Sequence, residues 1–179
     1  LDLKTAEAQA REAAIQLALE RVRARAMAMH QSQELAEVVA LMYGQIQSLG
    51  FTDWGCAIII CDEEDQIMYY WYADINMSHL PDYFKVPLTN KTIKKTWELW
   101  KQGTPQFIIE LHDKKMAEYA DFMLEETDHK NLPQEVKDGW RSEKNVYFSY
   151  SNIKYGLLEF TEVVPFKEEN FTIYRRFAQ

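Results

Sequence analysis

Two cysteines and four histidines are the side chains of this sequence best suited to covalent or metal chemistry. Cys56 and Cys61 both fall in the apolar run Gly-Cys-Ala-Ile-Ile-Ile-Cys. Five residues apart in a strand, they point to opposite faces, which disfavours a disulfide between them. Redox catalysis would need loop cysteines that ionise and resolve one another. We therefore expect both thiols to be inert core groups.

The histidines have no ligand-like spacing, so we expect no zinc site. They are His30, His79, His112 and His129. A lone loop histidine such as His79 is only a weak signal for haem. The six glycines are isolated, which gives no phosphate-binding loop, and the motifs of protein kinases are missing. These patterns favour a non-catalytic chain, with any kinase or cyclase activity outside it.

An aromatic group near the middle of the chain is the best candidate for binding a small molecule. Tyr70 and Tyr72 share one face of an expected strand, and the stretch that follows contributes His79, Tyr83 and Phe84. If these side chains meet, they form a cavity with apolar walls and polar tips. The alternative is that they fill the core beneath a loop, as aromatic residues at strand spacing usually do. The pattern names no cofactor.

The cysteines and tyrosines lie on an expected β-hairpin over residues 55–73. Its first strand is apolar on both faces, which predicts a central place in a sheet covered on both sides. The acidic turn at 62–65 keeps the connection in water. A short strand at 107–111 and a second hairpin, with strands at 146–150 and 155–164, complete the expected sheet.

Helical patterns flank and separate these hairpins. Helices are expected over residues 1–30, from Ser32 to Gly50, from Thr89 or Asn90 to Gln102, around Met116–Met123, from Pro133 to Trp140, and from Phe171 onward. The stretches 74–88 and 125–131 are expected to be surface loops, the latter mobile. Antiparallel hairpins separated by a helical insertion predict an α+β sandwich.

The N-terminal helix carries a narrow apolar stripe. Ile15, Leu19, Val22, Ala26 and Met29 are spaced four, three, four and three residues apart, which is the a/d pattern of a coiled coil. This spacing favours a dimer seam. The alternative is a helix that lies along its own domain.

The composition limits the class of partner. A chain of 179 residues with 47% hydrophobic content is long enough for one well-filled core. Its net charge of −8 argues against a nucleic-acid or anionic membrane surface. With no signal peptide and no apolar run long enough to span a bilayer, we expect a cytoplasmic protein. The missing initial methionine and the absence of a final helix cap predict an excised domain with neighbours outside this sequence.

Several segments together resemble GAF-like sensory domains of bacterial two-component sensor histidine kinases. They are Ala18–Met29, Ser32–Val39, Leu49–Phe51, Gly156–Phe160 and Phe171–Phe177. The resemblance implies an antiparallel sheet of about five or six strands with helices on both faces and long terminal helices that pair in a dimer. It divides the chain into an N-terminal signalling helix (1–31), the sensory domain (32–166) and the start of a C-terminal helix (167–179).

The ligand types best known for this family are not predicted. Asn90-Lys91 is present, but the phenylalanine and later Asp-Glu pair of cyclic-nucleotide binders are not found at the required spacing. Neither cysteine is followed by histidine, which argues against a covalently attached bilin. We therefore expect a non-catalytic regulatory module that couples a stimulus to a downstream output domain through dimeric helices. A small-molecule sensor with an aromatic pocket, or a redox enzyme of the same fold, are the alternatives.

Overall fold

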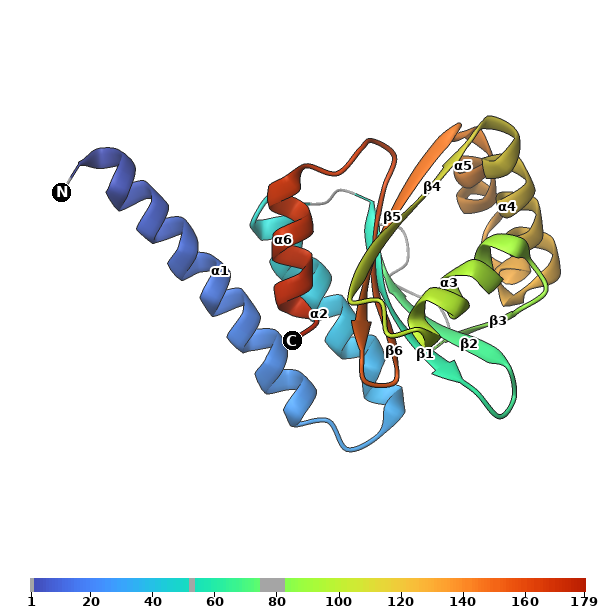
Figure 1. Ribbon diagram of the computed structural model, residues 1–179, viewed down its shortest axis with the longest axis horizontal. Coiled ribbons are helices and arrows are strands. Elements are labelled where there is room, and N and C mark those ends of the chain that lie inside the picture. Colours follow the sequence, from blue (N-terminus) through green and yellow to red (C-terminus); the bar gives the residue numbers. More distant parts are fainter. Residues whose placement is uncertain (1, 52–53, 75–82) are drawn as a thin grey trace.

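The chain folds into an antiparallel sheet packed between two layers of helices (Figure 1). The computed structural model describes residues 2–51, 54–74 and 83–179. Within them the sheet has six strands in the order β3-β2-β1-β6-β5-β4. The α+β class and the antiparallel sheet predicted from the sequence are confirmed.

The strands and helices have the following bounds. The strands are β1 (Gly55–Asp62), β2 (Ile67–Ala73), β3 (Phe84–Pro87), β4 (Gln106–His112), β5 (Asn145–Ile153) and β6 (Gly156–Glu162). The α-helices are α1 (Leu3–Met27), α2 (Leu35–Ser48), α3 (Lys91–Lys101), α4 (Asp113–Glu126), α5 (Gln134–Ser142) and α6 (Glu168–Phe177). Two 3-10 turns, η1 (Ser32–Glu34) and η2 (Asp128–Asn131), precede α2 and α5.

Strand β1 lies inside the sheet, between β2 and β6, as its apolar sequence predicts. Ala57 and Ile59 face one helical layer, whereas Cys56 and Ile58 face the other. Alternate residues of a strand point to opposite faces, so a strand covered on both sides must be apolar throughout. This alternation fixes which residues of the neighbouring strands share a layer.

The two helical layers cover different faces of the sheet (Figure 1). Helices α3, α4 and α5 pack on one face, which we call the α4 face. Helices α1, α2 and α6 lie over the opposite face, which we call the α6 face. Both terminal helices therefore lie on the α6 face.

Local signals set several helix ends. The Asn90 side chain accepts hydrogen bonds from the backbone N–H groups of Thr92 (2.8 Å) and Ile93 (3.3 Å), which caps α3. Gly50 and Gly103 follow α2 and α3 with φ of 75° and 74°, a left-handed conformation that glycine adopts without strain. Both glycines were predicted as helix stops.

Two predicted boundaries were wrong. The expected loop at 74–88 contains strand β3, because Phe84–Pro87 pairs with the edge of β2. The expected four-residue turn of the second hairpin is shorter, since Asn152 and Ile153 remain paired with Leu157 and Gly156. Polar residues at the end of β5 concealed this continuation, because backbone pairing does not depend on side-chain polarity.

The predicted dimer seam is largely occupied within the chain. Ile15, Leu19 and Val22 are buried in the same apolar cluster as α2 and α6. Met29 is partly buried against this cluster, and Ala26 is exposed. The stripe therefore packs along its own domain, which was the alternative interpretation of the pattern.

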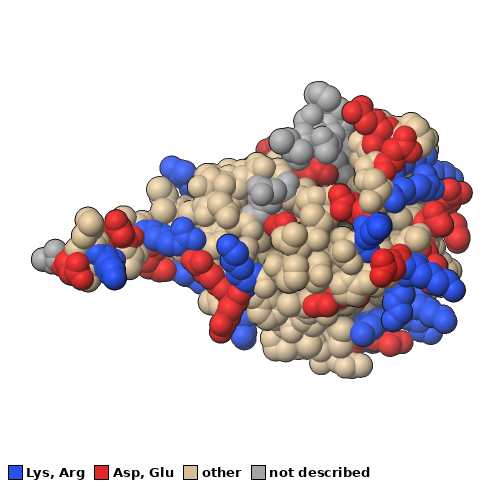
Figure 2. All heavy atoms as spheres, turned by 90° about the horizontal axis from the view of Figure 1, so that it is seen from above, with Lys and Arg blue, Asp and Glu red and all other residues tan. Residues whose placement is uncertain are grey.

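The N-terminal end of α1 projects from the body of the molecule (Figure 1). Its surface carries charges of both signs (Figure 2). Arg11 pairs with Glu169 (2.8 Å) and Glu12 with Arg176 (2.6 Å), which ties the middle of α1 to α6. Among the helices of the described residues, none is long and apolar enough to cross a membrane.

Gly156 offers a test of how closely β1 and β6 approach. A Cβ at this position would collide with the backbone carbonyl of Ile59. We expect Gly156→Ala to lower the free energy of unfolding by about 1–3 kcal/mol, because the strands must separate. Gly139→Ala in α5, where a Cβ would meet nothing within 4 Å, should raise it by up to about 1 kcal/mol. Urea melts that rank the two variants otherwise would contradict this packing.

Candidate ligand cavity

Glu159 is a carboxyl group buried in the middle of the sheet. It lies in β6 between Leu158 and Phe160, and only 2% of its surface is exposed. Its cross-strand partners are Ala57 of β1 and Tyr150 of β5, so the side chain points to the α4 face. An acidic side chain is almost never fully buried unless it is paired, which makes this position unusual.

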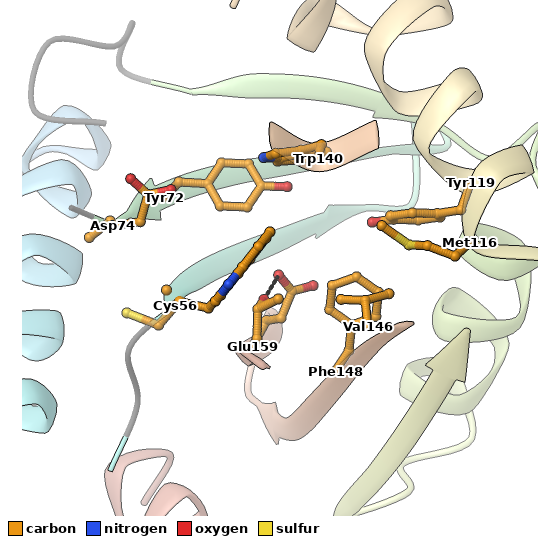
Figure 3. A pocket seen from close by; sticks show the side chains of 13 residues that line it. Cys56, Tyr72, Asp74, Met116, Tyr119, Trp140, Val146, Phe148 and Glu159 are labelled. Atoms are coloured by element: carbon orange, nitrogen blue, oxygen red, sulfur yellow. Dashed lines mark hydrogen bonds between the residues drawn. The ribbon is translucent and has the colours of Figure 1, made fainter. Parts of the chain in front are cut away.

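A cavity of about 40 Å³ lies in front of this carboxyl group, between the sheet, α4 and α5. Its lining residues are Trp54, Gly55, Cys56, Tyr72, Ala73, Asp74, Met116, Tyr119, Trp140, Val146, Phe148, Glu159 and Thr161. Figure 3 shows the Glu159 carboxyl group directed into the space, with Tyr119 and Phe148 on one side and Tyr72 and Trp140 opposite. Gly55 has no side chain on this face, which helps to leave the space open.

The two carboxyl oxygens of Glu159 differ in their contacts. Oε1 accepts a hydrogen bond of 3.3 Å from the Thr161 hydroxyl, whereas the buried Oε2 has no hydrogen-bond partner among the described residues. Burial raises the pKa of this carboxyl to about 7, although the hydroxyls of Tyr150 and Thr161 lower it in part. A group with this pKa changes its charge near neutral pH.

The charge of Glu159 acts on several aromatic hydroxyls. Burial raises the pKa of Tyr70, Tyr72, Tyr119 and Tyr150 well above the ordinary value, and the Glu159 carboxylate raises each further. These phenols therefore stay neutral and cannot compensate the carboxylate by ionisation. Of the lining residues that the structure describes, none is a lysine, arginine or histidine.

Tyr72 connects the cavity to a buried histidine. The Thr127 hydroxyl donates to the carbonyl of Met123 (2.6 Å), so it must accept the 2.7 Å hydrogen bond from Nδ1–H of His129. Burial lowers the pKa of His129 to about 3, so the ring is neutral and its Nε2 accepts from the Tyr72 hydroxyl at 3.1 Å. The hydroxyl proton of Tyr72 is thus directed to His129 and not to Glu159.

The structure brings together three of the five predicted binding residues. Tyr70 stacks on Tyr72 (centroids 5.4 Å apart), and Phe84 contacts Tyr72 edge-on (5.7 Å). Of these three, only Tyr72 lines the cavity. The predicted residue Tyr83 lies instead against Tyr69 and Trp71 on the α6 face. Because Phe84 begins a strand, the residue before it points to the opposite face.

His79, the fifth predicted binding residue, lies outside the described residues.

Sequence reasoning missed both polar residues of this region. His129 lies in the stretch 125–131 that was predicted to be a mobile surface loop, but it is fully buried and stacks on Phe84 (4.3 Å). The side chain of Asp128 also accepts a hydrogen bond from the backbone of Lys85 in β3 (2.9 Å). Glu159 had a readable signal: an acidic residue between apolar neighbours, in a strand covered on both faces, must be buried.

The cysteines do not contribute thiolate chemistry to the cavity. Cys56 lines it but directs its sulfur away from Glu159 (Figure 3), and burial raises the pKa of both Cys56 and Cys61. The thiolate is the reactive form, so both groups are poor nucleophiles. Within the described part of the chain, no three His, Cys, Asp or Glu side chains are grouped to hold a metal ion.

This arrangement predicts slow thiol modification. In the native state, a thiol reagent should label Cys56 and Cys61 at least about a hundredfold more slowly than in denaturant, because labelling requires opening of the sheet. The measurement is a time course of labelling followed by mass spectrometry. Rapid stoichiometric labelling of either native cysteine would contradict the assigned burial and would favour redox chemistry.

No protein-family model matches this chain. A search of curated proteins also finds no match. The cavity and the placement of the terminal helices are therefore the features from which a function can be inferred.

Proposed function

We propose that this chain is a non-catalytic regulatory module of GAF-like fold from a bacterial signalling protein, and that it binds a small molecule in the cavity at Glu159. The observation that carries the proposal is a buried carboxyl oxygen that faces a cavity and has no hydrogen-bond partner in the described part of the chain. Leaving such a group unsatisfied costs about 1–3 kcal/mol or more, so a fold retains it where it serves binding or catalysis. The two hairpins, the helical insertion between them and the helices on both faces agree with a GAF-like fold.

Strand β6 gives the cavity a direct mechanical connection to the terminal helices. Glu159 points to the α4 face, and its neighbour Phe160 points to the α6 face, where it stacks on Tyr174 of α6 (centroids 3.9 Å apart, planes at 10°). The Tyr174 hydroxyl donates to the carbonyl of Phe51 (2.9 Å). A ligand that shifts β6 would therefore favour one arrangement of α6 over another, which is how binding alters an output.

The proposal is tested by ligand screening coupled to hydrogen exchange. Small fragments of cationic, neutral and anionic type are screened for an increase in Tm, and hits are located by NMR at the Met116 methyl group in the cavity. For a hit in the cavity, we expect slower amide exchange in β6 and a changed exchange rate in α6. If no fragment binds in the cavity, the binding function is refuted. If binding leaves α1 and α6 unchanged, the regulatory coupling is refuted.

A homodimer through the terminal helices is part of the proposal. All residues from Asp2 to Ala14 are exposed, so this half of α1 buries no apolar side chain against the described chain, although Arg11 and Glu12 form ion pairs with α6. Leu3 and Leu17 are exposed by 72% and 48%. Leu17 is two residues from Ile15, about 200° around the helix, so it lies opposite the face that packs within the chain.

We expect Leu17→Glu to weaken dimerisation at least about tenfold, since it places like charges across an apolar contact. Sedimentation at several micromolar concentrations measures the effect. The control is Val164→Glu, which changes an exposed apolar residue outside the helices. Val22→Glu is unsuitable, because Val22 is buried within the chain and its replacement would destabilise the fold itself. A wild type that stays monomeric would exclude this role for α1.

A further inference from the structure

We infer that the cavity selects a small organic cation, of the alkylammonium class, which the Glu159 carboxylate and the surrounding aromatic rings hold together. This inference rests on the proposed function, because it assumes that the cavity binds a small molecule. It adds the charge, the size and the chemical class of that molecule. Three independent properties of the lining support it.

The first property is charge. Among the described residues that line the cavity, Glu159 and Asp74 are acidic and none is basic. An anion placed there would be repelled and would lose its hydration without compensation. A cation would instead give the buried carboxylate the opposite charge that the described lining does not supply.

The second property is the missing hydrogen bond. The Thr161 hydroxyl donates to Oε1, and the Tyr72 hydroxyl is committed to His129. The Tyr150 hydroxyl lowers the pKa of this carboxyl, yet Oε2 has no hydrogen-bond partner among the described residues. A protonated amine can donate an N–H to this oxygen. Hydrogen bonds between two ionised groups are about twice as strong as neutral ones, which favours an ammonium over an alcohol.

The third property is the wall of the cavity. The rings of Tyr72, Tyr119, Trp140 and Phe148 surround the carboxyl group (Figure 3). The faces of aromatic rings attract cations, and such cages are the common way in which proteins bind methylated ammonium groups. The apolar rings also contact the methyl groups of a methylated ammonium ion. A hydrated metal ion has no such apolar surface.

The size of the cavity limits the ligand. A volume of about 40 Å³ corresponds to roughly three water-sized groups, given about 10–15 Å³ for each. Trimethylammonium, with four heavy atoms, is the suitable probe. A ligand this small reaches a Kd of roughly 40 µM at the tightest, so the test must cover the millimolar range.

The probe experiment is an NMR titration of the full chain at pH 8. Trimethylammonium chloride is compared with isopropanol, a neutral molecule of equal heavy-atom number, and with sodium acetate. We expect trimethylammonium to shift the Met116 methyl signal and to give ligand contacts there. The Met42 methyl group, which is buried on the α6 face, should not contact the ligand. Isopropanol should bind at least about tenfold more weakly, and acetate should not bind.

The pH dependence gives a test that needs no variant. Glu159 must be ionised to bind a cation, and burial raises its pKa to about 7. Trimethylammonium stays protonated over this range, because aliphatic ammonium ions lose their proton only near pH 10. Its affinity should therefore rise about tenfold between pH 6 and pH 8, in proportion to the ionised fraction of Glu159. The other titratable groups near this carboxyl are Tyr70 and Tyr72 of β2, Tyr119 of α4, Tyr150 of β5, Cys56 of β1 and Asp74 after β2.

The variant that tests the role of the carboxylate is Glu159→Gln. It keeps the shape and removes the charge, so trimethylammonium binding should fall at least about thirtyfold and lose its pH dependence. The weak binding of isopropanol should change by less than about twofold. The matched control is Glu162→Gln, which replaces a second buried carboxyl of β6 that points to the opposite face.

Each outcome separates the inference from the proposed function. Cation binding at Met116 that depends on Glu159 and on pH supports both. If isopropanol or acetate binds in the cavity as well as trimethylammonium, the cation inference is refuted, whereas the binding function stands. If Glu159→Gln binds trimethylammonium as tightly as the wild type does, the carboxylate is not the recognition group. If no probe or screened fragment binds there, both are refuted.

Discussion

Acidification from pH 6.5 to pH 3 should cost the folded chain about 4–5 kcal/mol through His129 alone. Burial lowers the pKa of this imidazole to about 3, whereas the unfolded chain binds the proton near pH 6.5. Between these values the unfolded state holds one more proton than the folded state. Stability must therefore fall by about 1.4 kcal/mol for each pH unit through this window, and it is independent of His129 above pH 6.5.

The measurement is a set of urea melts at half-unit intervals from pH 7.5 to pH 3, for the wild type and for His129→Gln. Glutamine does not titrate and retains an acceptor for the Tyr72 hydroxyl, although it loses the stacking on Phe84. The variant should thus be less stable at pH 7.5 by about 1–3 kcal/mol, and the difference should shrink as the pH falls.

The control for this experiment is His112→Gln. His112 is exposed, and hydrogen bonds with Asn145 and Glu110 raise its pKa. Its contribution is present below pH 6.5 and is lost as the pH rises, opposite in sign to that of His129. His112→Gln should therefore lose stability on acidification as the wild type does. Parallel profiles for the wild type and His129→Gln would show that the imidazole is not buried in its neutral form.

The sheet could be predicted from the sequence because the types of its residues alone indicate that they are buried. The run from Cys56 to Cys61 is apolar at every position, and this requires cover on both faces wherever the rest of the chain lies. Asn90 and Gly103 likewise mark helix ends through their own conformational preferences. The stretch 125–131 looked like a loop because it is polar, but contacts with β2 and β3 bury its central histidine. Only the tertiary fold provides these contacts.

The cavity could be predicted only in part. The acidic residue within Gly-Leu-Leu-Glu-Phe of β6 signals a buried carboxyl group, because its neighbours are covered on both faces. The residues around it cannot be predicted from the sequence pattern, because they come from five other elements: β1, β2, β5, α4 and α5. Tyr83 shows the same limit at a smaller scale. It was predicted to lie in a loop together with Phe84, and only the pairing of β3 with β2 shows that the two residues point to opposite faces.

His129 and Glu159, both on the α4 face, make the stability of the fold depend on pH in opposite directions. Protonation of the buried imidazole destabilises the folded state, and so does ionisation of the buried carboxyl group. Between about pH 4.5 and pH 6.5 the two contributions nearly cancel, so their sum leaves stability flat there and lower on either side. Tyr72, which bonds to His129 and lines the cavity beside Glu159, lies between the two groups.

Glu159→Gln should therefore remove a loss of stability that the wild type shows at alkaline pH. The folded carboxyl has a pKa of about 7, against an ordinary value of about 4.5 for a glutamate, so the folded state holds one more proton than the unfolded state between these values. The stability that this proton provides is complete below pH 4.5 and is lost as the pH rises through 7. The full loss is about 3 kcal/mol, because each unit of pKa difference corresponds to about 1.4 kcal/mol.

Urea melts of Glu159→Gln and the wild type at pH 5, 7 and 8.5, without added ligand, measure this loss. The variant should be close to the wild type at pH 5 and more stable by up to about 3 kcal/mol at pH 8.5, since the neutral amide needs no counter-charge in the cavity. Glu20→Gln, at an exposed position of α1, should not change the profile. Trimethylammonium at a saturating concentration should return stability to the wild type at pH 8.5 and leave Glu159→Gln unaffected, because only the ionised carboxylate binds it. A variant that is less stable than the wild type at pH 8.5 would show instead that groups within the fold already stabilise the Glu159 carboxylate. The inference that the cavity binds a cation would then be refuted.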